Sequence, residues 1–339
     1  MARTSIAISI AAFLGVTLSL SFARSHSNVP DRDYLVVANK GEHTMGIIDP
    51  AADKQIATVP EGGITGHEVA VSPDGRKAYV PIYGNSGVGK PGTDGRNMVV
   101  VDLASREVVG NLDFGHAVRP HCAVFGPKNG LLYVTTELDK TISVIDPKTL
   151  KIIGEIPTEQ TESHMLAVSH DGRRGYTANV GPGTVSVLDL QAKKTITIIP
   201  ISHETQRISI TPDDKLVFTA DQTKPQIAVI DTATDKVKAW VPIPAPGYGT
   251  APTRDGRYLL VCVPKAKQVV VIDIRELKVV HTIDVPKSPQ EVLVRPDDKM
   301  AYVSCDSSSQ VAAIDIGTWT VAKLIDAGKG VDGLAWAAR

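Results

Sequence analysis

The chain has 339 residues, of which 36 are lysine or arginine and 37 are aspartate or glutamate, for a formal net charge of −1. This balance gives no basic surface of the kind that binds nucleic acid, so no nucleic-acid partner is expected. With 42% apolar residues, 28 glycines and 22 prolines, the composition favours many short strands joined by turns, and the length fits one large all-β domain.

The first predicted element is an apolar run, Ile6–Phe22, that follows the basic residue Arg3. Small residues in Ser21–Ala23, with a second option ending at Ser25, match the positions that a signal peptidase reads. We therefore predict a signal peptide over residues 1–25 and a periplasmic or secreted mature protein. The run is about 17 residues long, which is short for an uncleaved anchor. Since no later segment is apolar enough, no membrane span is expected after cleavage.

The remaining chain, residues 30–339, repeats one unit seven times. Each unit contains an apolar run that ends in aspartate, and these aspartates recur about every 42 residues, with one early insertion. They are Asp49, Asp102, Asp146, Asp189, Asp231, Asp273 and Asp315. Each unit reads as four short strands rich in valine, isoleucine, threonine and tyrosine, with turns such as Ser72–Gly75 and no helical periodicity. Four strands in roughly 40–45 residues is typical of a propeller blade.

The two ends of the chain are predicted to share one blade. The segment that starts at Tyr34 supplies a second, third and fourth strand, whereas the last segment, GVDGLAWAA, supplies only a first strand. Pairing the two closes the ring and leaves no open sheet edge. The expected fold is therefore an all-β, seven-bladed β-propeller with four-stranded blades. A β-solenoid, which would not need this split blade, is the less favoured alternative.

The stretch LLYVTTELDKTISVIDPKTLKIIGEIP resembles the repeat of the YVTN-type β-propeller family, and GYTANVGPGTVSVLDLQAKK is similar to it. The resemblance extends over nearly the whole mature chain and implies the propeller fold. That family includes surface-layer and periplasmic proteins of unknown role, and its relatives include lactonase-type enzymes and the cytochrome d1-like propeller of nitrite reductases. The resemblance therefore implies no single activity, and function has to be argued from the site.

Aligning the seven predicted first strands places one polar residue at the start of each. In chain order these are His67, His121, His164, Gln206, Tyr248, Gln290 and Asp332. Because the first strand of each blade lines the central axis, we expect these residues to form a ring at the channel mouth. Three neighbouring members are histidines, and three of seven blades cover only roughly 100° of arc, so their imidazoles can reach one point.

Three histidines on one side of a channel predict a metal centre. Neutral imidazole binds zinc, manganese, iron, nickel or copper. Three protein ligands with an open position are typical of a catalytic metal site. We therefore predict a divalent metal ion held by His67, His121 and His164. The alternative is a wet channel lining, because repeat proteins also copy residues by duplication.

Further polar residues are expected at the same mouth. The candidates for substrate binding are Arg119, Glu137, Gln206, Arg207, Gln290 and Asp332. The candidates for a catalytic acid or base are Tyr248, Glu68 and Glu291, and the sequence does not choose among them. Basic, amide and acidic groups around a metal suit an anionic or sugar-like small molecule.

Other motifs give no support to other enzyme classes. The insertion Gly84–Asn97 contains G-x-x-x-x-G-K, but Pro91 follows Lys90 and strand sequence follows the loop, so a flexible loop or lid is expected instead of a P-loop. There is no G-x-S-x-G or H-E-x-x-H motif. The three cysteines form no C-x-x-C-H motif and are interpreted as small buried hydrophobes.

The favoured function is thus an exported propeller with a small-molecule site at the channel mouth. A three-histidine metal centre there would support lyase, lactonase-like or isomerase chemistry. The alternative is a non-catalytic binding or scaffold propeller for a protein, a polysaccharide or a nucleic acid. The sequence predicts no oligomeric state.

Overall fold

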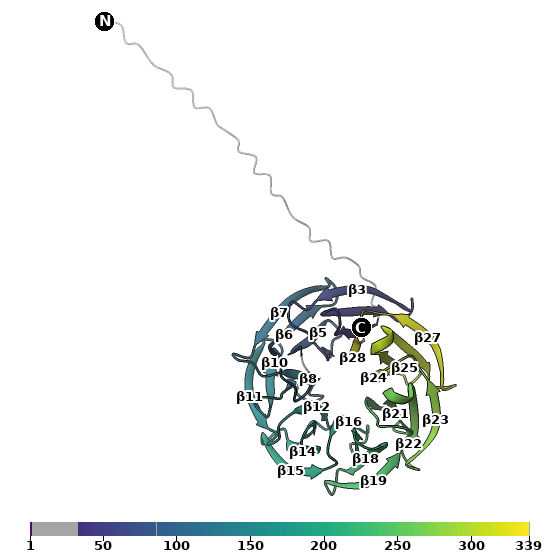
Figure 1. The fold of residues 1–339 in the computed structure, drawn as a ribbon. Coiled ribbons are helices and arrows are strands. Elements are labelled where there is room, and N and C mark those ends of the chain that lie inside the picture. Colours follow the sequence, from purple (N-terminus) through teal and green to yellow (C-terminus); the bar gives the residue numbers. More distant parts are fainter. Residues whose placement is uncertain (2–32, 86, 339) are drawn as a thin grey trace. The chain divides into compact units, whose positions relative to one another are not determined.

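The computed structural model describes Met1, residues 33–85 and residues 87–338. The predicted signal peptide therefore lies outside the described residues except for Met1. The chain divides into two units, residues 1–30 and 31–339. The second unit forms seven four-stranded antiparallel sheets arranged as blades around a central axis (Figure 1). The predicted seven-bladed β-propeller is confirmed. No helix in the described part of the chain is long and apolar enough to cross a bilayer.

The strands of each blade run outward from the axis in chain order, except in the blade that combines both ends of the chain. That blade contains β28 (Val331–Ala337), β1 (Tyr34–Asn39), β2 (Thr44–Asp49) and β3 (Lys54–Pro60). The next three blades are β4 (Ala70–Val71), β5 (Lys77–Gly84), β6 (Asp94–Asp102) and β7 (Glu107–Asp113), then β8 (Pro120–Phe125), β9 (Leu132–Thr136), β10 (Thr141–Asp146) and β11 (Lys151–Pro157), then β12 (Ser163–Val168), β13 (Arg174–Asn179), β14 (Thr184–Asp189) and β15 (Lys194–Pro200).

The other three blades have the same strand order. They are β16 (Thr205–Ile210), β17 (Leu216–Asp221), β18 (Gln226–Asp231) and β19 (Lys236–Pro242), then β20 (Thr250–Pro252), β21 (Tyr258–Val263), β22 (Gln268–Asp273) and β23 (Lys278–Asp284), then β24 (Pro289–Val294), β25 (Met300–Cys305), β26 (Gln310–Asp315) and β27 (Thr320–Asp326). Short 3-10 turns, η1 (Pro264–Ala266) and η2 (Asp306–Ser308), come directly after β21 and β25.

The ring closes as the sequence predicts. Strand β28 pairs antiparallel with β1, with Tyr34 opposite Ala337 and Val37 opposite Leu334. The last strand of the chain is therefore the inner strand of the blade that the first strands build. The inner edge of β1 acquires its neighbour only when the two chain ends meet, and this pairing removes an open edge.

The repeated aspartates cap the turn between the third and fourth strands. Asp189 Oδ1 accepts hydrogen bonds from the backbone N–H groups of Gln191 (3.0 Å) and Ala192 (2.8 Å). Asp102, Asp231 and Asp273 accept the equivalent pairs. Short acidic side chains favour turns in this way. Turn chemistry, which every blade needs, therefore accounts for the repeat.

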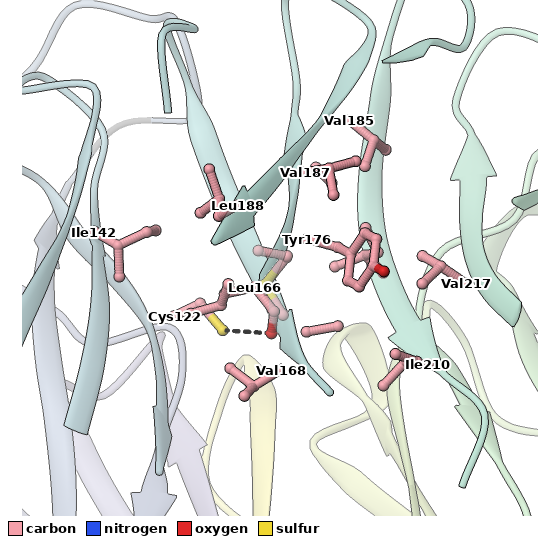
Figure 2. Close-up of a cluster of buried hydrophobic side chains, with 14 of the residues drawn as sticks. Cys122, Ile142, Leu166, Val168, Tyr176, Val185, Val187, Leu188, Ile210 and Val217 are labelled. Atoms are coloured by element: carbon pink, nitrogen blue, oxygen red, sulfur yellow. Dashed lines mark hydrogen bonds between the residues drawn. The ribbon is translucent and has the colours of Figure 1, made fainter. Parts of the chain in front are cut away.

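The core lies between neighbouring blades. Figure 2 shows both faces of one blade: on one face the thiol of Cys122 donates to the Leu166 carbonyl oxygen (Sγ···O 3.8 Å), and on the other Tyr176 lies toward Val217 of the next blade. Cys122, Cys262 and Cys305 are all buried and unpaired. Their interpretation as buried hydrophobes is confirmed.

Candidate functional site

Irregularities in the inner strands place most of the predicted ring residues. The pairing register shifts between Pro120 and Ala123, around His121, and between Ser163 and Met165, around His164. Equivalent shifts surround Gln206, Gln290 and Asp332. A bulge leaves a residue unpaired and changes the direction of its side chain. The recurring bulge therefore accounts for polar side chains at an otherwise apolar strand.

Two ring residues lie outside the inner strands, contrary to the prediction that each begins one. His67 precedes β4 and Tyr248 precedes β20. At these points the backbone makes isolated contacts instead of a continuous ladder. Gly66 forms a single bridge with Ile82, and the Tyr248 N–H donates to the Cys262 carbonyl oxygen (2.8 Å).

The three predicted metal ligands lie together. The His121 and His164 rings are stacked with centroids 3.4 Å apart, and the His67 and His121 centroids are 5.6 Å apart at an interplanar angle of 88°. Tyr83, at the end of β5, contacts all three rings at centroid distances of 4.8, 5.1 and 5.7 Å. We name the set His67, Tyr83, His121, Glu137 and His164 the histidine cluster.

Burial favours the neutral form of His67 and His121. His121 and His164 are 1% and 2% exposed. Burial lowers the pKa of His67 to about 3, although the Asp332 carboxylate acts in the opposite direction. Burial, together with the neighbouring His164 and His67, also holds the pKa of His121 well below its ordinary value. Neutral imidazole is the form that ligates a metal or accepts a proton.

A second set of charged residues spans the central channel, and we name it the ionic cluster. Its members are Lys40, Glu68, Arg207, Asp306 and Asp332. Arg207, on β16, donates to Glu68 (Nη1···Oε1 2.5 Å) and to Asp332 on β28 (Nη2···Oδ1 3.0 Å). Lys40 donates to Asp332 and to Asp306, both at 3.1 Å. Strands β16 and β28 lie on opposite sides of the ring (Figure 1). The Arg207 side chain therefore ties the two sides of the channel together.

The carboxyl groups around Arg207 differ in the direction of their pKa shifts. Burial raises the pKa of Glu68 well above its ordinary value, and Glu68 and Glu291 share a hydrogen bond. Burial also raises the pKa of Glu291, whose Oε2 accepts the Leu334 N–H (2.7 Å). For Asp332, Lys40 and Arg207 outweigh burial and hold the pKa below its ordinary value. The pair Glu68–Glu291 can thus hold one proton beside an ionised Asp332.

The predicted acid–base residues gather at the ionic cluster. Tyr248 lies under the Arg207 guanidinium, with the Arg207 Cζ 4.9 Å from the ring centroid, so Tyr248, Glu68 and Glu291 all surround Arg207. Gln206 is 9% exposed, and Gln290 donates to the Ser288 carbonyl oxygen at 3.4 Å.

The two arginines predicted to bind substrate have partners within the protein. Arg207 uses both terminal nitrogens on carboxylates, and its buried Nε lacks a hydrogen-bond partner among the described residues. Arg119 Nε donates to Asp94 and Nη2 to the Lys90 carbonyl oxygen, both at 2.6 Å. Arg119 therefore fastens the Gly84–Asn97 insertion to the rim. Its distant partners were not evident from the sequence.

Tyr83 is the residue whose importance the sequence did not reveal. It is fully buried, its ring contacts the three histidines, and its hydroxyl donates to Glu137 Oε2 (2.8 Å). Its position at the end of a second strand, next to the insertion, indicated only that it faces the mouth. The only sequence signal for this role was the presence of a tyrosine at the end of a strand that faces the mouth.

The residue types in the histidine cluster are suited to binding a divalent ion, but their side chains are not arranged around a common point. Three imidazoles and an adjacent carboxylate are a known donor set for such ions. Among residues 33–85 and 87–338, however, no group of three His, Cys, Asp or Glu side chains is arranged to hold one ion. The rings of His121 and His164 are instead stacked, with an interplanar angle of 28°. Ligation would require at least one ring to rotate.

Comparisons with known proteins define the family and the fold. The model of a family described as "Domain of unknown function (DUF5074)" matches residues 111–288. No curated protein matches the chain. A hydrazine synthase chain from Kuenenia stuttgartiensis is similar in structure, with a TM-score of 0.72 and 20% identity over 83% of this chain and 92% of that one.

A functionally unknown protein from Desulfotomaculum acetoxidans is also similar. Its TM-score is 0.74 and its identity 14%, over 90% of this chain and 98% of that one. At these identities both likenesses concern the fold. They support the propeller architecture and leave the YVTN-type resemblance as a prediction.

Proposed function

Because the chain belongs to the family of the domain of unknown function DUF5074, whose description assigns no activity, we propose its function from the residues at the channel mouth. The proposal is a small-molecule site in which His67, His121 and His164 hold a divalent metal ion. The observation that carries it is the gathering of three histidines from three neighbouring blades, with successive ring centroids 5.6 and 3.4 Å apart. Side chains this close can reach one ion by rotation about their χ angles.

The finer parts of the proposal concern the residues around the histidines. A bound ion would supply Lewis acidity or an activated water, which suits lyase, lactonase-like or isomerase chemistry. Glu68, Glu291 and Tyr248 are the proposed acid–base groups, because a carboxyl pair that shares a proton can both give and take one. Arg119 and Arg207 are paired with Asp94, Glu68 and Asp332. This pairing favours the sugar-like ligand over the anionic one.

We also propose that the protein is exported after removal of residues 1–25. The observations in support are Arg3, the apolar run and the small residues at its end. We further propose that the chain is related to the YVTN-type and lactonase-like propellers, because its repeat sequence supports these relationships.

Metal analysis of two matched variants tests the metal site. Full-length protein without an affinity tag is loaded with zinc or manganese, dialysed and analysed by mass spectrometry for bound metal. We expect about one ion per wild-type chain and none in His121→Ala. The control is His281→Ala, because His281 lies on the outer strand β23 and is exposed. Equal metal content in wild type and His121→Ala, including none in both, would refute the metal site.

One observation favours a second function, a non-catalytic binding propeller. The stacked His121–His164 pair, and an Arg207 whose two terminal nitrogens are held by carboxylates, give the mouth a defined arrangement in which no ion takes part. Such a mouth suits recognition of a protein or polysaccharide at the rim. If treatment with a chelator leaves the melting temperature of the wild-type protein unchanged, the result would favour this function.

A further inference from the structure

Glu137 uses both carboxylate oxygens inside the histidine cluster. Oε1 contacts His164 Nδ1, and Oε2 accepts the Tyr83 hydroxyl at 2.8 Å. Glu137 is 3% exposed, and Tyr83 is fully buried. A ligand would have to break one of these contacts to reach the carboxylate directly. The side chain that the sequence suggested for substrate binding is therefore placed to act on His164.

These contacts determine where the ring protons sit. An ionised carboxylate only accepts hydrogen bonds, so the nitrogen that faces Glu137 carries the proton in neutral His164. His121 Nδ1 lies 3.2 Å from the His164 carbonyl oxygen, which also only accepts. Neutral imidazole has a single ring proton. In their neutral forms both rings are therefore Nδ1–H tautomers, and both Nε2 atoms then keep their lone pairs.

We infer that Glu137 is a positioning residue that fixes His164 as its Nδ1–H tautomer, with Tyr83 holding Glu137, so that His121 and His164 both offer Nε2 lone pairs to a ligand. The ligand class is then an electron-pair acceptor, either a divalent cation or a group that donates an N–H or O–H. The identity of that acceptor as a metal rests on the proposed function, whereas the tautomer does not.

The pairing of the nearby charged side chains also favours a ligand that accepts an electron pair over an anionic ligand. Lys40 and Arg207 are engaged with Asp306, Asp332 and Glu68. Arg119 is engaged with Asp94. An anionic ligand would have to displace one of these carboxylates, each of which lies within 3.1 Å of its cation. A cation or a hydrogen-bond donor requires no such exchange.

The test is nitrogen NMR of the histidine rings in metal-free, full-length protein at neutral pH. Selective ¹⁵N-histidine labelling separates Nδ1–H from Nε2–H rings by their chemical shifts, and His121→Gln and His164→Gln assign the signals. We expect Nδ1–H for His164 in the wild type and a shift toward Nε2–H in Glu137→Gln, because a glutamine amide can donate to Nδ1. Tyr83→Phe should keep the tautomer. The control Glu155→Gln, on the exposed face of β11, should change nothing.

A zinc titration of the same proteins separates this inference from the proposed function. If the metal site exists, Glu137→Gln should weaken zinc binding roughly 10- to 100-fold, the usual effect of removing a carboxylate that orients a histidine ligand. An Nε2–H signal for wild-type His164 overturns the inference, as does an unchanged tautomer in Glu137→Gln. A tautomer change without zinc binding supports the inference and rejects the metal site.

Discussion

Glu61 is a buried carboxyl group just ahead of the segment that carries His67, and its ionisation should destabilise the fold. Its side chain is 1% exposed. Oε2 accepts the Gly66 N–H at 2.8 Å, and the buried Oε1 lacks a hydrogen-bond partner among the described residues. Burial raises its pKa from 4.5 to about 7, against the opposing effect of the Gly66 hydrogen bond. We predict that Glu61→Gln removes a pH-dependent loss of stability.

The size of that loss can be worked out from the two pKa values. A group whose pKa is higher in the folded chain stabilises the fold fully below its unfolded pKa, and this contribution is lost as the pH rises through the folded pKa. For Glu61 the loss therefore begins near pH 4.5 and is complete somewhat above pH 7. At about 1.4 kcal/mol for each tenfold change in proton affinity, it amounts to about 3 kcal/mol in the free energy of unfolding.

Urea unfolding at about pH 4.5 and about pH 8 measures this difference. The glutamine carbonyl can keep the Gly66 hydrogen bond, whereas its buried amide N–H groups add a cost that does not depend on pH. The stability of Glu61→Gln relative to wild type should thus rise by about 3 kcal/mol between the two pH values. Glu155→Gln, at an exposed site on β11, should show no such trend. A rise below about 1 kcal/mol would refute the buried, protonated state of Glu61.

Two further predictions concern the ionic cluster and the N-terminus. Arg207→Met leaves Glu68 and Asp332 buried without their guanidinium partner, so urea unfolding at neutral pH should show a loss of about 3–5 kcal/mol; a loss under about 1 kcal/mol would mean that water or Lys40 replaces the arginine. The mature protein isolated from its native host should begin between Arg24 and Asn28, as read by N-terminal sequencing, and recovery of chains that still begin at Met1 would contradict export.

The fold was predictable because its period is set by local chemistry. Each blade needs an aspartate at the same turn, and the hydrogen bonds of Asp102 or Asp189 explain why that residue recurs. The split blade could be predicted by counting strands at the two ends, and β28 does pair with β1. The short inner strands β4 and β20 were not predictable. Their lengths depend on backbone contacts of Gly66 and Tyr248 with neighbouring strands, which no local pattern encodes.

The candidate site was predictable in its positions and not in its contacts. Repeat alignment brought His67, His121 and His164 to one place, and the ring contacts agree with that placement. It did not predict that Arg207 pairs with Glu68 and Asp332, which lie 139 and 125 residues away in sequence. An alignment of repeats gives the height of each residue along the axis. Which side chains meet across the axis depends on rotamers and on the local bulges.

Two kinds of recurrence in this chain have different causes. The turn aspartate occurs in all seven repeats, as expected of a residue that every blade needs for folding. Histidine occurs at the ring position in three neighbouring blades, and Gln206, Gln290 and Asp332 occupy the same bulge elsewhere. The bulge therefore does not require histidine. His164 is moreover held by a buried carboxylate, Glu137, that is itself held by Tyr83. The ring position accepts other residues in other blades, and at His164 it is supported by a buried carboxylate and a buried tyrosine; both observations support the proposed ligand site over duplication alone.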